Sequence, residues 1–200
     1  IFGTYKLVSD QSEMQKCPHN FKELLDILKH RHSVILKDRP QKQPGMFKDK
    51  SNRAGSTSFV LFDLLEGTLE KGFEIYRTLQ EPFQRALFMM FFISEVHPFA
   101  DGNGRVARIM MNAELVAAEE FRIIIPTIYR NSYLVALKVL SQSGKAAPLV
   151  RVLDFAQRYT LAIDWSSFEK SYANLEQTFA FMDPHEADLN GIRLILPNTN

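Results

Sequence analysis

The spacing of apolar residues along the chain predicts a mostly helical protein. The segment "NFKELLDILKHRH" offers Asn20 as an N-cap and repeats apolar residues at helical intervals, so a short amphipathic helix is expected there. Its polar end carries His30 and His32, which we expect to be in contact with solvent. Pro82 opens "PFQRALFMMFFISEV", which is apolar on nearly all sides, as a central buried helix would be.

Further helices are expected on both sides of this central segment. Helical spacing runs from Asp63 to Leu79, although two glycines weaken it, and "GRVARIMMNAELVAAEE" follows the central helix. Three more helical segments follow Pro126: "NSYLVALKVLSQSG", "APLVRVLDFAQRYTLAI" and "SSFEKSYANLEQTFAFM". The first twenty residues lack strong periodicity, and "GIRLIL" near the end fits either a strand or an extended tail.

One segment has a different character. "KDRPQKQPGMFKDKSNRAGSTSFV" contains two prolines, two glycines and many polar residues, so it cannot be a helix. Thr57 to Leu61 have strand character, which predicts an irregular loop that leads into a short hairpin or extended flap. The predicted fold class is therefore all-α with a small β-hairpin flap.

Composition narrows the possible functions. The chain has 200 residues, and its 24 basic and 23 acidic side chains give a formal net charge of +1, with no long run of one sign. We therefore expect neither nucleic acid nor an anionic membrane as a partner.

The cysteine content and the ends of the chain bear on where the protein works. A single Cys17 excludes an intrachain disulfide and a cysteine-rich zinc site. No apolar run reaches membrane-spanning length and no signal peptide opens the chain, so a cytoplasmic location is expected. Because the chain starts at Ile1, we interpret it as a piece of a longer protein or a processed one.

The candidate chemistry lies in "HPFADGNGR", directly after the central helix. Gly102 and Gly104 permit a tight turn and a close approach of a ligand to the backbone. A helix that begins near Asn103 would point its free N–H groups back at this turn, which makes an anion site. Arg105 and Arg108 are three positions apart and can share a face of that helix. Together these groups suit a polyphosphate.

Two further residues of the motif add reactive groups. Asp101 would be unfavourable beside a bare phosphate, but it fits if Mg²⁺ lies between the carboxylate and the phosphate oxygens. His97 could accept a proton from an incoming hydroxyl. Each residue alone also has a structural explanation as a cap or a turn residue. Their conjunction within nine residues favours a phosphoryl- or nucleotidyl-transfer site.

"HPFADGNGR" followed by "VAR" resembles the Fic-domain signature, His-Pro-Phe-x-Asp/Glu-Gly-Asn-Gly-Arg-x-x-Arg, at every fixed position. "PGMFK" and "NRAGSTSFV" resemble the upstream strand and the flap of that family. The resemblance extends from about Pro44 to Tyr159. It implies an N-terminal segment with one helix over 1–43, a Fic-like catalytic core with its flap over 44–160, and a C-terminal helix and tail over 161–200.

The resemblance implies a protein adenylyltransferase. A Tyr, Thr or Ser hydroxyl of a target protein would attack the α-phosphate of ATP bound with Mg²⁺, so that AMP is attached and pyrophosphate leaves. His97 would be the general base, Asp101 the Mg²⁺ ligand and Phe99 a core anchor for the turn. The triphosphate would be held by Gly102, Asn103, Gly104, Arg105 and Arg108. The flap that covers the nucleotide and pairs with the target backbone would contain Gly55, Ser56, Thr57 and Ser58. The adenine pocket would include Tyr133 and Ser141, which are explained equally well as ordinary helix residues.

The chain departs from the family pattern in two places. Many members carry an inhibitory Ser/Thr-x-x-x-Glu-Gly/Asn helix whose glutamate pairs with the second arginine, here Arg108. In this chain the spacing occurs only from Ser9 to Glu13, and Met14 follows, so we interpret it as accidental. Inhibition would then be absent, or lie on a segment or partner outside this chain. Leu61-Phe62 stands after the flap where many relatives have prolines, which leaves the register of the target open.

Three hypotheses therefore remain. The first is AMP transfer from ATP to an unidentified target protein. The second is another transfer on the same fold, with a phosphoryl, UMP or phosphocholine group. The third is a nucleotide-sensing module without catalysis, against which the presence of both His97 and Asp101 argues. A homo-oligomer is also compatible with the sequence, whereas a helix-turn-helix DNA binder is disfavoured by the charge balance.

Overall fold

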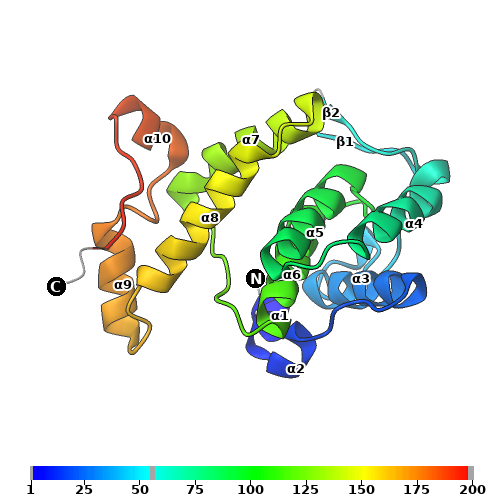
Figure 1. Cartoon of the computed structure of the whole chain (residues 1–200), viewed down its shortest axis with the longest axis horizontal. Coiled ribbons are helices and arrows are strands. Elements are labelled where there is room, and N and C mark those ends of the chain that lie inside the picture. The colour runs from blue at the N-terminus through cyan, green and yellow to red at the C-terminus, as the bar shows by residue number, and fades with distance from the viewer. Residues whose placement is uncertain (1, 55–56, 198–200) are drawn as a thin grey trace. The chain divides into compact units, whose positions relative to one another are not determined.

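The computed structural model describes residues 2–54 and 57–197 of the chain. The chain divides into two compact units, Ile1–Glu120 and Phe121–Asn200 (Figure 1). These units differ in extent from the three segments expected from the sequence, whose boundaries at 43/44 and 160/161 stay predictions. The fold class is confirmed, because almost all regular structure is helical and the two strands described form one small hairpin.

The first unit contains most of the predicted elements. Its helices are α1 (Phe2–Ser9), α2 (Gln11–Met14), α3 (Phe21–Ile35), α4 (Leu65–Tyr76), α5 (Pro82–Val96) and α6 (Asn103–Ala117). Strands β1 (Arg53–Ala54) and β2 (Thr57–Ser58) pair antiparallel, and short 3₁₀ turns lie at Pro40–Lys42 and Phe62–Leu64. The helices α1 and α2 were not predicted, because their eight and four residues are too few to display a clear period.

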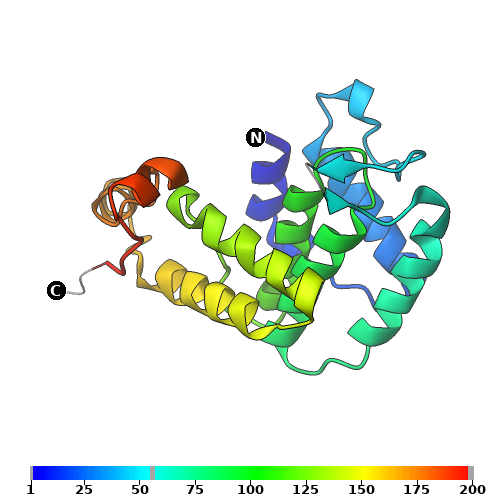
Figure 2. The ribbon, with the colours of Figure 1, turned by 90° about the horizontal axis from the view of Figure 1, so that it is seen from above.

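The core of the first unit is built around α5 and α6. These helices pack against each other, α3 packs against α6 and α4 packs against α5 (Figures 1 and 2). The prediction of a central apolar helix is confirmed for α5, which buries six residues: Ala86, Met89, Met90, Phe92, Ile93 and Val96. The contact between α4 and α5 depends on Gly72, since a Cβ there would lie 2.1 Å from the Phe92 ring.

Helix α3 begins where the sequence predicts. The side chain of Asn20 accepts a hydrogen bond from the N–H of Glu23 at 2.9 Å, and the carboxylate of Glu23 accepts one from the N–H of His19 at 2.9 Å. Asn20 thus caps the helix by accepting an N–H group that the helix itself leaves unpaired, and Glu23 ties the residue before the cap to the first turn. At the other end of α3 the expectation is wrong for one residue: His30 is exposed, but His32 is completely buried.

The second unit is a helical bundle with its own core. It contains a 3₁₀ turn at Thr127–Tyr129 and the helices α7 (Arg130–Ser143), α8 (Ala147–Ala162), α9 (Phe168–Gln177) and α10 (Pro184–Leu189). Its buried cluster consists of Ile128, Tyr159, Ile163, Ala180, Ala187 and Leu194. The hydroxyls of Tyr159 and Thr178 share a hydrogen bond of 2.6 Å inside this unit. "GIRLIL" forms neither a helix nor a strand, and α10 was not predicted.

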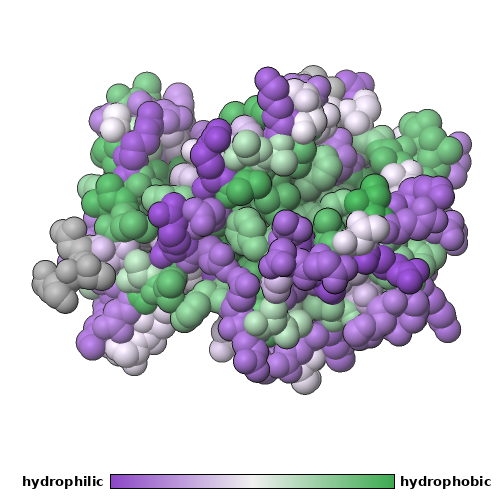
Figure 3. All heavy atoms as spheres, in the orientation of Figure 1, coloured by the Kyte–Doolittle hydropathy of each residue, from purple (hydrophilic) through white to green (hydrophobic). Residues whose placement is uncertain are grey.

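The surface mixes polar and apolar side chains. Hydrophobic and hydrophilic residues interleave on the face shown in Figure 3. In the described part of the chain, no helix combines the length and hydrophobicity that crossing a membrane requires.

Candidate active site

The motif forms the turn between the central helices α5 and α6. Helix α5 ends at Val96, and His97 follows in the left-handed region with φ 52°, where its N–H donates to the carbonyl of Ile93 at 3.1 Å. Gly102, with φ 80°, is the N-cap of α6, which begins at Asn103. A non-glycine residue with positive φ is uncommon and is usually held in place by its surroundings. The predicted helix break and the predicted start of the next helix are both confirmed.

The surroundings of His97 leave one ring nitrogen available as a base. Its Nδ1 lies 3.1 Å from the carbonyl oxygen of Ser94, and since a carbonyl only accepts, Nδ1 carries the proton. The lone pair is then on Nε2. The ring stacks on Phe59, with centroids 3.6 Å apart and planes 8° from parallel. Burial, with a smaller effect from the charge of Lys48, lowers the pKa of His97, so the imidazole is neutral at pH 7. A general base needs this state.

Phe99 and Asn103 lock the shape of the turn. Phe99 is completely buried, in agreement with its predicted role as an anchor. The amide of Asn103 accepts from the Phe99 N–H at 2.9 Å and donates to the Phe99 carbonyl at 2.8 Å. Asn52 donates to the same carbonyl at 2.9 Å. The predicted contact of Asn103 with phosphate would therefore use its backbone N–H, because its side chain already bonds to Phe99 inside the turn.

The first turn of α6 presents donors to an anion. The N–H groups of Arg105 and Val106 both bond to the carbonyl of Gly102 at 3.0 Å, and the N–H groups of Asn103 and Gly104 come before the first helical hydrogen bonds. Gly104 is half-buried, and a Cβ placed there would lie 3.6 Å from a guanidinium nitrogen of Arg108. Arg108 thus lies beside this first turn, and its contact with phosphate stays a prediction.

Asp101 is surrounded by cations, two of which sequence reasoning missed. Its carboxylate accepts the N–H of Gly102 at 2.6 Å and lies 3.7 Å from Arg105. Arg39 and Lys42 each lie 3.9 Å from its other oxygen. They come from a polar loop about sixty positions earlier, and no local pattern distinguishes them from other surface cations. Three cationic side chains and one backbone N–H therefore surround the Asp101 carboxylate.

The donor set at Asp101 fits Mg²⁺. A carboxylate that is 34% exposed offers the hard oxygen ligand that this ion prefers, and phosphate oxygens commonly complete its coordination. Within residues 2–54 and 57–197, no three His, Cys, Asp or Glu side chains gather as a metal cluster. The predicted site thus has one protein ligand, and its occupancy by Mg²⁺ stays a prediction.

The segment before the flap runs beside the motif. The N–H of Lys48 donates to the carbonyl of Pro98 at 2.9 Å, and its buried ammonium donates to the side chain of Asn52 at 2.9 Å and to the carbonyl of Val96 at 3.3 Å. Burial lowers the pKa of Lys48. The expectation of an upstream strand at "PGMFK" is wrong, because this stretch bonds to the motif turn and the first strand begins at Arg53.

The hairpin supplies the predicted flap, although it is short. Arg53 is opposite Ser58 and Ala54 is opposite Thr57. Thr57 and Ser58 are exposed, as pairing with a target backbone would require. The other two predicted flap residues, Gly55 and Ser56, lie outside the described residues.

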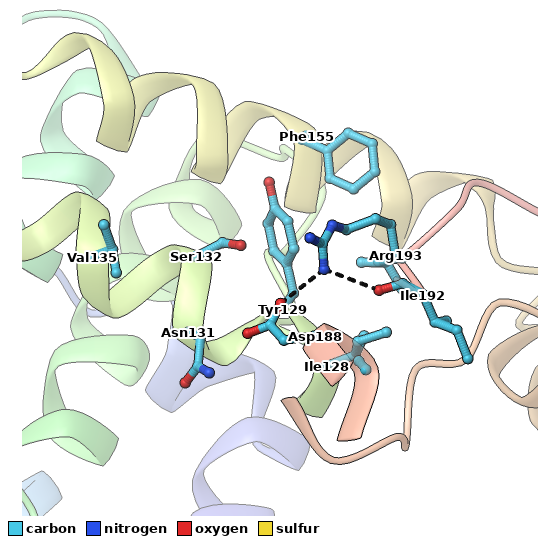
Figure 4. A pocket seen from close by; sticks show the side chains of 11 residues that line it. Ile128, Tyr129, Asn131, Ser132, Val135, Phe155, Asp188, Ile192 and Arg193 are labelled. Carbon is cyan, nitrogen blue, oxygen red and sulfur yellow. Dashed lines mark hydrogen bonds and ion pairs between the residues drawn. The ribbon is translucent and has the colours of Figure 1, made fainter. Parts of the chain in front are cut away.

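The two adenine candidates belong to the second unit. Both lie on α7, where Tyr133 is buried and Ser141 is exposed. Their contact with a nucleotide stays a prediction. This unit also has a cavity of about 530 Å³, with Tyr129 and Arg193 among its lining residues (Figure 4). Arg193 pairs with Asp188 at 2.8 Å across it. Neither of the adenine candidates, Tyr133 and Ser141, lines this cavity.

Glu13 has structural partners. Its side chain is 7% exposed and lies 2.7 Å from Lys16, 3.6 Å from Arg31 and 3.8 Å from His30. Arg31 is completely buried and also donates to the carbonyls of Glu13 and Lys16. These side-chain contacts tie α2 to Arg31 of α3 and account for a glutamate at this position.

The sequence model of the Fic/DOC family matches residues 22–115, a range that includes the whole motif turn. Residues 22–115 belong to the Fic/DOC family. The chain is 32% identical over 116 residues to the protein adenylyltransferase Fic of Culex quinquefasciatus, and this alignment covers 56% of this chain and 22% of that protein. It is 38% identical over 80 residues to the protein of the same name from Drosophila yakuba, and this alignment covers 40% of this chain and 16% of that protein. The chain thus spans about a fifth of the length of these relatives.

Solved structures show the same fold. The Fic-1 protein of C. elegans superimposes with a TM-score of 0.65 at 18% identity, over 88% of this chain and 51% of that one. A Fic-domain-containing signaling protein of Bacteroides thetaiotaomicron superimposes with a TM-score of 0.66 at 17% identity, over 80% of this chain and 67% of that one. At these identities the likeness concerns the fold alone.

Proposed function

We propose that this Fic domain transfers AMP from ATP to a Tyr, Thr or Ser hydroxyl of a target protein. The observation that carries the proposal is the motif turn itself, where a neutral His97 with a free Nε2 shares one short loop with the Asp101 carboxylate and the first-turn donors of α6. The relatives named protein adenylyltransferase Fic support the choice of AMP as the transferred group.

In the proposed reaction His97 Nε2 accepts the proton of the target hydroxyl as its oxygen attacks the α-phosphorus of ATP. The new bond joins this oxygen to phosphorus, and the bond from phosphorus to the oxygen bridging the α- and β-phosphates breaks. Pyrophosphate leaves with that electron pair. Held by Asp101 together with phosphate oxygens, Mg²⁺ would neutralise charge on the phosphates.

The remaining residues of the site bind and orient the donor. The N–H groups of Asn103 and Gly104 and the guanidinium groups of Arg105 and Arg108 offset negative charge on the triphosphate, most strongly where it develops on the leaving pyrophosphate. Phe59 keeps water from one face of the His97 ring and holds its plane. The exposed edge of β2 would align the target backbone.

The test is incubation of the protein with α-³²P-ATP and Mg²⁺, with and without cell lysate. Wild type is compared with His97→Ala and with His30→Ala, a control that removes an exposed histidine of the same unit. Labelling of a protein band by wild type and His30→Ala but not by His97→Ala supports the proposal. Equal labelling by His97→Ala refutes the base assignment.

The donor label separates the alternatives. Labelling from γ-³²P-ATP in place of α-³²P-ATP would indicate phosphoryl transfer, and labelled UTP or CDP-choline would reveal UMP or phosphocholine transfer. ATP binding by calorimetry without any labelled product would indicate a nucleotide-sensing module.

A further inference from the structure

A buried histidine outside the motif lies against three residues of the motif turn. His32 is 0% exposed and is 69 positions before Asp101, near the end of α3. A buried polar ring is costly unless its nitrogens are hydrogen-bonded. Both nitrogens of His32 have partners, and these partners belong to two different loops: Gly45, before the flap, and Asp101, in the motif.

The two hydrogen bonds fix the tautomer of the ring. The N–H of Gly45 lies 2.9 Å from Nδ1, and because a backbone N–H only donates, Nδ1 is the acceptor. A neutral imidazole then carries its proton on Nε2. That N–H donates to the carbonyl oxygen of Asp101 at 3.1 Å. The ring therefore connects the Gly45 loop to the motif: its Nδ1 accepts a hydrogen bond from Gly45, and its Nε2–H donates one to Asp101.

The ring also packs on the turn. It stacks on Phe99 with centroids 3.8 Å apart and planes 6° from parallel. A Cβ added to Gly102 would lie 3.5 Å from its Cδ2 atom. Gly45 itself has φ 78° and comes so near α3 that a Cβ would lie 3.2 Å from Ser33, so the acceptor end is held as firmly as the donor end.

The peptide unit between Asp101 and Gly102 is held from both sides. Its carbonyl accepts from His32, and its N–H donates to the Asp101 carboxylate at 2.6 Å. The plane of this peptide therefore sets the direction of the carboxylate. The same peptide leads into the first turn of α6, whose N–H groups form the anion site.

We propose that His32 is a positioning residue that orients the Asp101–Gly102 peptide, and through it the carboxylate and the start of α6, for the metal-bound donor nucleotide. The inference rests on the proposed function for the identity of the ligand. Outer-shell partners of this kind commonly change metal affinity or activity about 10–100-fold when they are removed. His32 acts through a backbone group and touches no reacting atom.

Two substitutions separate this role from simple packing. In His32→Gln the amide extends to the place of Nε2 and can still donate to the Asp101 carbonyl. In His32→Asn the amide ends near the place of Nδ1, where it can accept from Gly45 but cannot reach Asp101. Both variants lose the stacked ring and both retain a buried amide, so a packing role would disturb the turn in both. His30→Asn, on the exposed part of the same helix, is the control.

The first measurement is made on the ligand-free protein. Hydrogen–deuterium exchange of peptides that cover the motif turn should accelerate in His32→Asn and stay near the wild-type rate in His32→Gln, relative to peptides of α5. The ¹⁵N chemical shifts of the wild-type ring give a check that needs no variant: the Nε2–H tautomer is expected, and the Nδ1–H tautomer would overturn the proposal. Equal acceleration of the turn in both variants would also overturn it.

The second measurement is binding of ATP by calorimetry over a series of Mg²⁺ concentrations. His32→Asn should raise the half-saturating Mg²⁺ concentration about tenfold, and His32→Gln should restore most of the loss. Equal Mg²⁺ dependence in the two variants contradicts the positioning role. Failure of the proposed function has a different signature, because wild type would then label no protein while the exchange and tautomer results for His32 stand unchanged.

Discussion

Replacement of Asn103 by alanine tests whether this motif residue serves the turn or the nucleotide. Its side chain is 1% exposed and makes two hydrogen bonds to the backbone of Phe99, of 2.9 and 2.8 Å. Alanine leaves the buried Phe99 N–H without this acceptor, which costs about 1–3 kcal/mol, and loss of the second bond costs about 0.5–1.5 kcal/mol. The Phe99 carbonyl keeps its bond from Asn52, so the total stays at roughly 2–4 kcal/mol.

This cost is large enough to measure by thermal unfolding. In a chain of this size each kcal/mol lowers Tm by about 2–4 °C, so Asn103→Ala should lower it by roughly 5–15 °C in the absence of any nucleotide. Asn190→Ala provides the control, because it also removes an amide that donates to a backbone carbonyl, at 2.9 Å, but from an exposed position. A Tm for Asn103→Ala no lower than that of Asn190→Ala would refute the bracing role. If Asn103→Ala lowers only the affinity for ATP and not Tm, the Asn103 side chain binds phosphate and does not brace the turn.

Three further results are expected. Because burial lowers the pKa of His97 and catalysis requires its neutral form, kcat/KM should be fully developed at pH 7 and fall only as pH drops below about 6.5, measured between pH 5 and 9. Arg39→Gln combined with Lys42→Gln should weaken ATP binding a few-fold at low salt, and calorimetry at high salt should show a smaller difference. Gly72→Ala should cost about 1–3 kcal/mol in denaturant unfolding, whereas Gly67→Ala, with open space around it, should stabilise the protein by up to about 1 kcal/mol.

Each of these has a contradicting outcome. If kcat/KM already falls at or above pH 6.5, burial does not lower the pKa of the general base as expected for His97. Unchanged ATP affinity in the double variant at low salt would confine the anion site to the motif and the start of α6. Equal stability of Gly72→Ala and Gly67→Ala would show that α4 and α5 can move apart to accommodate a Cβ beside Phe92 without loss of stability.

Local patterns in the sequence predict the parts of the site that depend on local structure. Pro82 and Gly102 mark the starts of α5 and α6, and the motif turn between these helices can be recognised without information from distant residues. The convergence of His32, Arg39 and Lys42 on the motif turn could not be predicted, because it depends on how α3 and the following loop pack. A histidine at a polar helix end looks like a solvated one in sequence, whereas the fold buries it.

The directions of the side chains within the motif also could not be predicted from the sequence. Asn103 stands between two glycines in a loop that suits phosphate, and spacing alone assigns it to the ligand. The structure shows that an asparagine at the first position of a helix can reach back four residues and bond both polar groups of one peptide backbone position. Such a contact depends on the turn already being formed.

The exposed hairpin has a consequence for how this domain could acquire new targets. Four described residues form the paired part of the flap, and both Thr57 and Ser58 are exposed. Variation there carries almost no penalty in folding, whereas the turn between α5 and α6 is fixed by buried bonds. A library randomised at Thr57 and Ser58 should therefore consist almost entirely of folded proteins, and under the proposed function its members would share one chemistry and differ in the polypeptide they accept.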